Sequence, residues 1–164
     1  MNTIELQDRL HLEAAKGWCE LHAYEEANHE LEWISASLQT HPKVLEVKWQ
    51  VCANLGKWEV ALEIASNFIG IAPELPNAWG YKAGSLRELE RDREAYEVLR
   101  EAARRFPRDE VILYDLACVC CSLKRPREAL AWLDWAMNIG GYEIKLRALD
   151  DPDLQPLQAE IATD

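Results

Sequence analysis

The stretch Trp79–Pro107, WGYKAGSLRELERDREAYEVLREAARRFP, sets a pattern that the rest of the chain repeats. Apolar residues recur in it every three or four positions, as in amphipathic helices, and the polar run Glu90–Arg91–Asp92 separates two such segments. Its small residues Ala83, Ala95 and Ala102 stand where two packed helices would have to approach each other closely. The stretch therefore predicts a pair of helices joined by a tight turn.

The same pattern recurs at an interval of 34 residues. Two positions show the interval most clearly, one occupied by alanine and one by leucine: Ala27, Ala61, Ala95 and Ala129, and Leu21, Leu55, Leu89 and Leu123. A period of this length is typical of stacked helix–turn–helix repeats. In this register we predict four repeats, at residues 8–41, 42–75, 76–109 and 110–143.

Prolines predict several of the helix ends. Pro42 and Pro76 stand at the start of the second and third repeats, and Pro73 and Pro107 stop the second helices of those repeats. Thr3 is a suitable N-cap for the first helix. Turns are expected at four equivalent places: His22–Ala23, Gly56–Lys57, Glu90–Arg91 and Lys124–Arg125. Among the residues at these turns, Gly56 is the type that best tolerates a left-handed helix cap.

The final residues, 144–164, depart from the period and are predicted to close the array. Asp151 followed by Pro152 has the pattern of an N-cap and a first-turn proline. The last repeat of a stack needs such a segment, because no neighbour buries its outer face. The sequence thus predicts an all-α fold, an α-solenoid of four repeats with a C-terminal capping helix, in a single domain spanning residues 1–164.

Composition narrows the class of function. The formal net charge of −11 argues against nucleic acid or an anionic membrane as a partner, since both require clustered positive charge. The sequence contains no apolar run of the ~18–20 residues that a membrane-spanning helix needs. The first ten residues, MNTIELQDRL, lack the pattern of a signal peptide. The five cysteines are odd in number, whereas a secreted protein with a disulfide framework is expected to show paired cysteines. We therefore expect a cytoplasmic protein.

The repeats resemble the tetratricopeptide repeat (TPR) family, whose pattern they match at fixed positions. The third repeat supplies Trp79, Ala83, Leu86, Ala95, Ala102 and Pro107, the fourth supplies Leu116, Ala117, Ala129 and Ala136, and the second supplies Trp58, Ala61, Phe68 and Pro73. The tail ALDDPDLQPL also resembles the closing segment of bacterial proteins with these repeats. The resemblance implies a superhelix of helix pairs that binds peptides or partner proteins in its concave groove and is not an enzyme.

The resemblance also implies which residues would line the groove, from fixed positions of each first helix. Those positions hold Arg9, Leu12, Lys16, Val47, Gln50, Asn54, Asn77, Tyr81, Gly84, Arg87, Tyr114, Asp115 and Cys118. The family's clamp for a C-terminal carboxylate requires lysine, asparagine and arginine at several of these places. Leu12, Val47 and Tyr81 occupy some of them here, so the sequence does not predict that clamp.

Two unusual features allow more than one interpretation. Gly80 and Gly84 lie one turn apart, where they leave either a shallow pocket for a partner or room for close packing between repeats. Trp49 stands where the other repeats have alanine, and Ala65 stands where they have leucine. We interpret this pair as an exchange of size within the core.

For the cysteines of the fourth repeat and the arginines of the third, the sequence favours structural roles. Cys118, Cys120 and Cys121 lack the second ligand pair of a zinc site, so packing is the favoured role and a thiol- or metal-dependent activity the lesser alternative. The arginines near the end of the third repeat are expected to pair with glutamates one turn away. We predict a non-enzymatic interaction module with no catalytic, cofactor or metal site, and a client-holding chaperone is the alternative.

Overall fold

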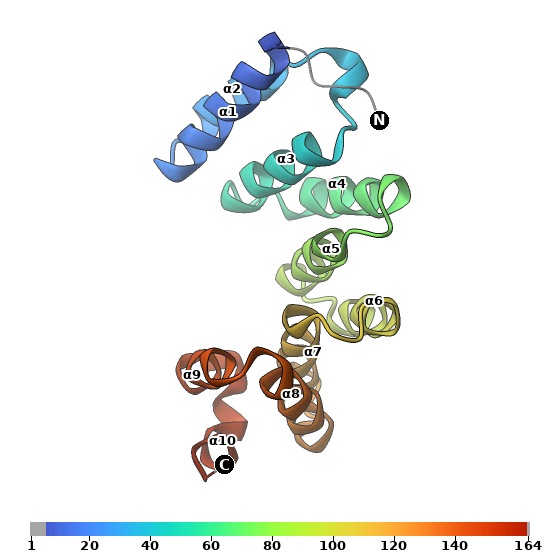
Figure 1. Ribbon diagram of the computed structural model, residues 1–164, viewed down its shortest axis with the longest axis vertical. Helices are drawn as coiled ribbons and strands as arrows, with labels where there is room; N and C mark the ends of the chain where they lie inside the picture. Colours follow the sequence, from blue (N-terminus) through green and yellow to red (C-terminus); the bar gives the residue numbers. More distant parts are fainter. Residues whose placement is uncertain (1–5, 164) are drawn as a thin grey trace. The chain divides into compact units, whose positions relative to one another are not determined.

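The computed structural model describes residues 6–163, and this part of the chain is helical with no strand (Figure 1). Each predicted repeat holds one pair of helices. The pairs are α1 (Leu6–Glu20) with α2 (Tyr24–Glu32), α3 (Pro42–Asn54) with α4 (Trp58–Ile71), α5 (Pro76–Glu88) with α6 (Asp92–Arg105), and α7 (Glu110–Ser122) with α8 (Pro126–Gly140). The all-α repeat fold is confirmed. Thr3 lies outside the described residues.

The turn inside each repeat has the same backbone geometry. The second residue after the first helix is left-handed in all four repeats, with φ values of 59° at His22, 69° at Gly56, 57° at Glu90 and 59° at Lys124. At each turn the backbone N–H of the residue that follows the left-handed one donates a hydrogen bond to the carbonyl five residues earlier, for example from Arg91 N to Leu86 O at 2.8 Å. This is the Schellman motif, and it forms although only one repeat has glycine there.

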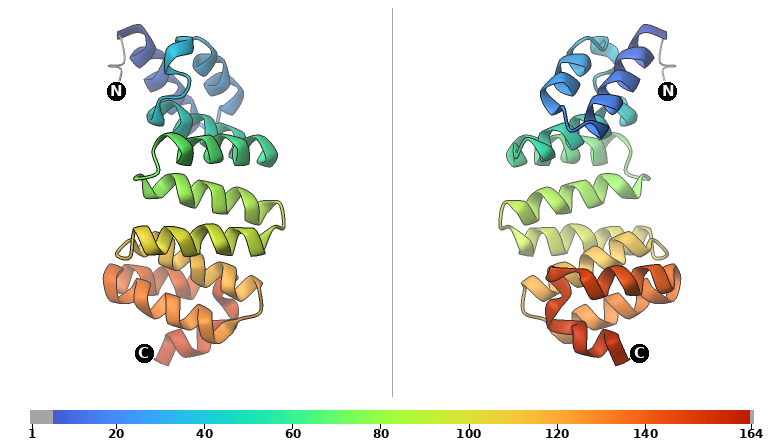
Figure 2. Two further views of the ribbon diagram at one scale, coloured as in Figure 1. Left: turned by 90° about the vertical axis from the view of Figure 1, so that its right-hand side faces the viewer. Right: turned by 90° about the vertical axis from the view of Figure 1, so that its left-hand side faces the viewer.

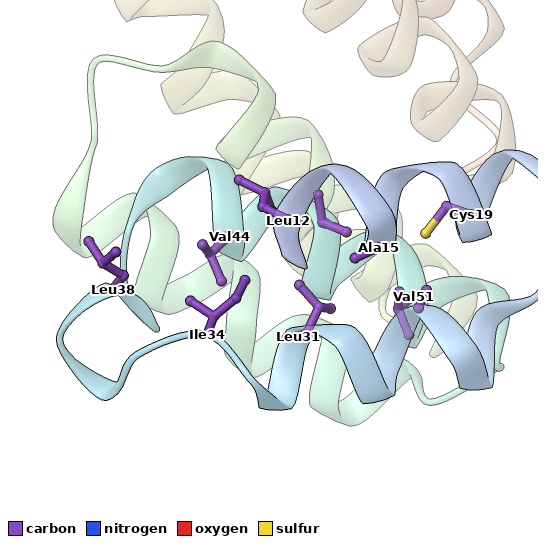
Figure 3. Packing of buried hydrophobic residues seen from close by; sticks show 10 residues of the cluster. Leu12, Ala15, Cys19, Leu31, Ile34, Leu38, Val44 and Val51 are labelled. Carbon is purple, nitrogen blue, oxygen red and sulfur yellow. The ribbon is translucent and has the colours of Figure 1, made fainter. Parts of the chain in front are cut away.

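The chain forms two compact units, residues 1–85 and residues 86–164, and the division falls inside α5. In unit 1, the buried side chains of α1 meet those of α2 and α3 (Figure 3). Leu12, Ala15 and Cys19 come from α1, while Leu31 comes from α2 and Val51 from α3. Small residues of the repeat pattern, such as the fully buried Ala15, allow these helices to approach one another closely.

The first repeat ends differently from the others, because α2 stops at Glu32 and a short 3₁₀ turn, Ala36–Leu38, follows. A buried carboxylate stabilises this ending. Asp8 accepts hydrogen bonds from the backbone N–H of Ser35 at 2.6 Å and from its hydroxyl at 3.1 Å. The Gln39 amide donates to the carbonyl oxygens of Leu31 and Ile34, at and just beyond the end of α2.

Unit 2 contains α6, α7 and α8, together with the closing segment predicted from the sequence. That segment comprises α9 (Tyr142–Asp150), a 3₁₀ turn (Pro152–Leu157) and α10 (Gln158–Thr163). Asp151 caps the turn as expected, since its carboxylate accepts from the Asp153 N–H at 2.9 Å. Leu154, Leu157 and Ile161 are almost fully buried. The segment is therefore an integral part of the core of this unit.

Exposed apolar residues correct part of the predicted core. Leu21 belongs to the repeating leucine position but is 70% exposed. Trp18, in the same repeat, is 37% exposed. Trp79 is buried, whereas Trp33 is exposed and stacks beside His11. Residues 6–163 include no helix long and apolar enough to cross a membrane.

Candidate functional site

In unit 1, polar and aromatic side chains from α3 and α5 form a connected cluster. Glu46 and Trp49 lie one turn apart on α3, and Asn77, Tyr81 and Ser85 follow one another at intervals of four on α5. Residues three or four apart share one face of a helix, so each helix presents its members together. We call these five residues the unit 1 cluster.

Two aromatic rings form the centre of the cluster. The rings of Trp49 and Tyr81 stack with centroids 4.1 Å apart and planes 15° from parallel. The Trp49 indole N–H donates to the Ser85 hydroxyl at 2.9 Å, and that hydroxyl donates to the Tyr81 carbonyl at 2.9 Å. Ser85 is fully buried but has both bonds satisfied. Trp49 is thus fixed in orientation while it remains partly exposed.

Glu46 gives the cluster its charge. One of its carboxylate oxygens, Oε1, accepts from the Tyr81 hydroxyl at 2.9 Å and from the Asn77 amide at 3.3 Å. Burial, together with the nearby Glu46 charge, raises the pKa of Tyr81 to about 12, so the phenol stays a donor at neutral pH. Within the described residues no hydrogen bond engages the other oxygen of Glu46, Oε2. That oxygen can accept from a ligand.

Gly84 borders the cluster on α5. A β-carbon placed there would lie 3.9 Å from the Trp49 ring, which is an ordinary contact distance. Close packing therefore does not require glycine at this position. The glycine instead leaves the edge of the indole less covered than a larger side chain would.

Four other predicted groove residues of unit 1 lie at least partly on the surface. Arg9, Gln50 and Asn54 are exposed, and Lys16 is partly exposed and forms an ion pair with Glu13 at 2.9 Å. The Asn54 amide donates to the backbone carbonyl of Gln50 at 2.8 Å. These side chains remain available to solvent.

Leu12 and Val47 do not lie in an open groove, which corrects the sequence-based assignment. They are 1% and 2% exposed and belong to the core that joins α1, α2 and α3. The physical reason is local. The first repeat turns its α1 stripe toward α3, so these two positions contact each other's helices instead of solvent.

In unit 2, the predicted groove residues meet the chain's own closing segment. The Tyr114 hydroxyl donates to the Asp151 carboxylate at 2.6 Å, and the Arg147 guanidinium lies 4.1 Å from the centre of the Tyr114 ring. Arg87 pairs with Asp153 at 2.5 Å. Tyr114 is fully buried as a result. A partner could reach Tyr114 only by displacing this segment.

Asp115 and Cys118 lie beside this contact on α7. Burial raises the pKa of Asp115 to about 6, although the positive charges of Arg147 and Arg87 oppose the shift. Burial also raises the pKa of Cys118, and the neighbouring carboxylates of Asp151 and Asp115 add to that effect. Cys118 is 2% exposed, so its assignment to an open groove is corrected.

The cysteines of α7 and the arginines of α6 make contacts within the fold. Cys118, Cys120 and Cys121 are buried, and burial raises the pKa of the Cys120 thiol to about 12. Such thiols are poor nucleophiles at neutral pH. Among the described residues, no group of three or more histidine, cysteine, aspartate or glutamate side chains is arranged to hold a metal ion. Arginines of α6 pair with glutamates one turn away, as Arg100 does with Glu97 at 2.6 Å.

Sequence reasoning placed Asn77, Tyr81 and Gly84 in the candidate site but not the residues that connect them. The repeat pattern predicts Trp49 as part of the core and gives no signal for Ser85. One signal was available, since Trp49 breaks the small-residue pattern in the same repeat that carries Glu46 one turn earlier. No periodic signal placed Asp151, Asp153 or Arg147 against α7, because these residues lie beyond the last repeat.

Comparison with known proteins supports the fold. The chain is similar to MamA 41-end from Desulfovibrio magneticus RS-1, at 17% identity and a TM-score of 0.74 over 98% of this chain and 94% of that one. It is also similar to a chain of the APC/C hetero-tetramer Cut9–Hcn1, at 16% identity and a TM-score of 0.74 over 95% of this chain and 30% of that one. These are TPR-like helical repeat proteins, so the fold is of the TPR type.

Sequence comparisons provide no closer relation. No protein-family model matches the chain. No curated protein matches it either.

Proposed function

We propose that the chain is a non-enzymatic protein-interaction module that binds a peptide segment of a partner at the unit 1 cluster. One observation carries the proposal: Glu46, Trp49, Asn77 and Tyr81 converge on one partly exposed face. Tyrosine and tryptophan are common anchors of binding interfaces, since they bury a large area at little entropic cost. The TPR-type fold agrees with this role, and a cytoplasmic location belongs to the same proposal.

The cluster also indicates the chemistry of its ligand. The free oxygen of Glu46 favours a donor, either a backbone N–H or a lysine or arginine side chain. The partly exposed Trp49–Tyr81 stack provides a flat surface next to it for an apolar or cationic side chain. A segment with a basic residue beside an apolar one fits both features, and the net charge of −11 favours the approach of such a segment.

Selection from a phage-displayed library of random peptides tests this function. We expect enriched peptides to carry lysine or arginine, and their affinity to fall ~10-fold or more, about 1.4 kcal/mol, in Glu46→Gln or Tyr81→Ala. Tyr142→Ala is the matched control, because Tyr142 is 70% exposed and lies in α9, in the other unit. The proposal would be contradicted if no peptide is enriched, or if the enriched peptides bind Tyr81→Ala and the unaltered protein with equal affinity.

A further inference from the structure

The first helix of the chain has a second apolar face in addition to the one it buries. Residues 8, 12, 15 and 19 of α1 form the buried stripe. On the opposite side, Leu6, Leu10 and Leu21, which follows the last residue of α1, are 62%, 57% and 70% exposed. With Ala14 and Gly17 they follow the spacing i, i+4, i+8, i+11 and i+15, which is one stripe of a helix. We call these five residues the α1 outer face.

The position of α1 explains why this face is uncovered. α1 lies at the edge of unit 1, where it packs on α2 and α3 (Figure 2). The end of a repeat stack buries its outer face only if a further segment covers it. In unit 2 the closing segment buries its own leucines. The described part of the chain has no equivalent segment on the α1 outer face.

The middle of the face is suited to close approach by another helix. Ala14 and Gly17 are the small residues of the stripe, with the leucines toward its ends. A β-carbon added to Gly17 would meet no heavy atom within 4 Å, so the space above it is open. Small residues at a helix contact allow the two axes to approach each other closely, and the space above Gly17 can accept a large apolar side chain.

Charged residues along one edge of the face indicate the occupant. Arg9, Glu13, Lys16 and Glu20 alternate in sign along this edge, in the order positive, negative, positive, negative. This order is complementary to its own reverse. If a second α1 runs antiparallel across the face, Arg9 meets Glu20 of the second copy, and Glu13 meets Lys16 of the second copy.

The apolar residues fit the same arrangement. A two-fold axis near Ala14 places Leu10 over the open space at Gly17 of the second copy, and it pairs Leu6 with Leu21 of the second copy. A parallel arrangement would instead put the charged edge against Gln7, His11 and Trp18, which offer no matching row of opposite charges. The antiparallel arrangement therefore satisfies both the apolar stripe and its charged edge.

We propose that the α1 outer face binds a second copy of this chain, in an antiparallel, two-fold symmetric helix pair. The contact is small. A helix of 15 residues is about 22 Å long, so one helix from each copy buries less than the ~1,200 Å² of a standard interface. A contact of this size is typical of a weak dimer that forms only at high protein concentration. It is independent of peptide binding at the unit 1 cluster.

Sedimentation velocity over about 1–500 µM protein tests the proposal. We expect the unaltered chain to shift from monomer to dimer, and Leu10→Glu to weaken the dimer by ~10-fold or more. Val60→Glu is the matched control, because Val60 is an apolar residue of α4 that is 46% exposed. A monomer at every concentration, or a dimer that Leu10→Glu leaves unchanged, would overturn the proposal and leave the face to a different protein.

Charge exchange and cross-linking test the antiparallel register. Lys16→Glu and Glu13→Lys should each weaken the dimer several-fold, and the two together should restore it. Ala14→Cys lies at the two-fold axis and should form a covalent dimer under mild oxidation, whereas Val60→Cys should not. If the double variant stays as weak as the single ones, or Ala14→Cys does not cross-link in a solution that is mostly dimer, the antiparallel pairing is wrong.

Discussion

Both units contain a tyrosine whose hydroxyl binds a carboxylate, and the two sites differ in what supplies that carboxylate. In unit 1, Tyr81 donates to Glu46 of a neighbouring first helix, and the ring remains partly exposed. In unit 2, Tyr114 donates to Asp151 of the closing segment, and the ring is fully buried. The same type of hydrogen bond therefore borders an open surface in one unit and holds a cover in place in the other.

The difference shows how a repeat can use equivalent helices in different ways. The first helix of an interior repeat can present its polar face to a partner. In the last repeat that helix must also support the segment that closes the array, because apolar surface left at the end of a stack destabilises the fold. Tyr114 and Cys118 are therefore buried in the core of unit 2, whereas Asn77 and Tyr81 have partly exposed side chains.

Removal of a buried leucine from the closing segment should have the largest effect. We expect Leu154→Ala to lower the free energy of unfolding of unit 2 by roughly 2–4 kcal/mol, since it leaves a cavity where the side chain is fully buried. Urea unfolding followed by circular dichroism measures the change. Leu146→Ala is the control, because Leu146 belongs to α9 and is 46% exposed. Equal effects of the two substitutions would show that the segment is not packed as described.

The raised pKa of Asp115 predicts a pH-dependent effect in unit 2 alone. The folded-state pKa of about 6 lies above the ordinary value of 3.8, so the folded state binds the proton more tightly than the unfolded state. Stability from this group is therefore present at low pH and is lost as the pH rises from about 4 to about 6. We expect Asp115→Asn to stabilise the protein by up to ~2 kcal/mol at pH 7.5.

Thermal melting at several pH values measures that effect. The gain from Asp115→Asn should shrink toward zero near pH 4, where the aspartate of the folded protein is already protonated. Gln50→Glu, an exposed change in unit 1, should shift the melting temperature little at any pH. A gain that stays constant with pH would mean that the charge of Asp115 is not its cause.

Matched removal of the two tyrosine hydroxyls tests the comparison directly. Tyr114→Phe should cost ~1–2 kcal/mol, because it leaves the partly buried carboxylate of Asp151 without one of its donors. Tyr81→Phe should cost ~0.5 kcal/mol or less, since Tyr81 is partly exposed, unlike the fully buried Tyr114, and water can replace its hydroxyl as a donor to Glu46. Denaturant titration of both variants measures the difference. A larger loss for Tyr81→Phe would reverse the assignment of the covered and open sites.

The smallest expected effect concerns the left-handed turns that the two units share. Glu90→Gly and Lys124→Gly should each stabilise the protein by ~0.5–1 kcal/mol, because glycine adopts a positive φ without strain. The reverse change, Gly56→Lys, should destabilise it by about the same amount. Melting temperatures provide the measurement. No change in any of the three variants would contradict the left-handed geometry.

Much of the fold was predictable because its signals are local. The interval of 34 residues, Pro42, Pro76 and Asp151 each act through short-range geometry, and the helices begin where these residues indicate. The turns were predictable in place but not in conformation, since His22, Glu90 and Lys124 are left-handed without being glycine. The left-handed conformation is imposed by the hydrogen bond that each turn makes to the carbonyl five residues earlier, and by the packing of the two helices that the turn joins.

The candidate site was predictable only in part. A repeat position indicates the face on which a side chain lies, which correctly grouped Asn77 and Tyr81 on one side of α5. It cannot indicate whether another element covers that face. Leu12 and Tyr114 were assigned to an open groove on the same grounds, yet α3 and the closing segment bury them. Burial depends on distant parts of the chain, which the period does not describe.

The sequence by itself determined the helix pairs and the position of the turn inside each repeat, because these follow from contacts between residues close together in the chain. Only the tertiary structure decided that Trp49 stacks on Tyr81 and that Asp151 covers Tyr114. Those contacts join residues more than 30 positions apart, and only the packed fold fixes which of them meet.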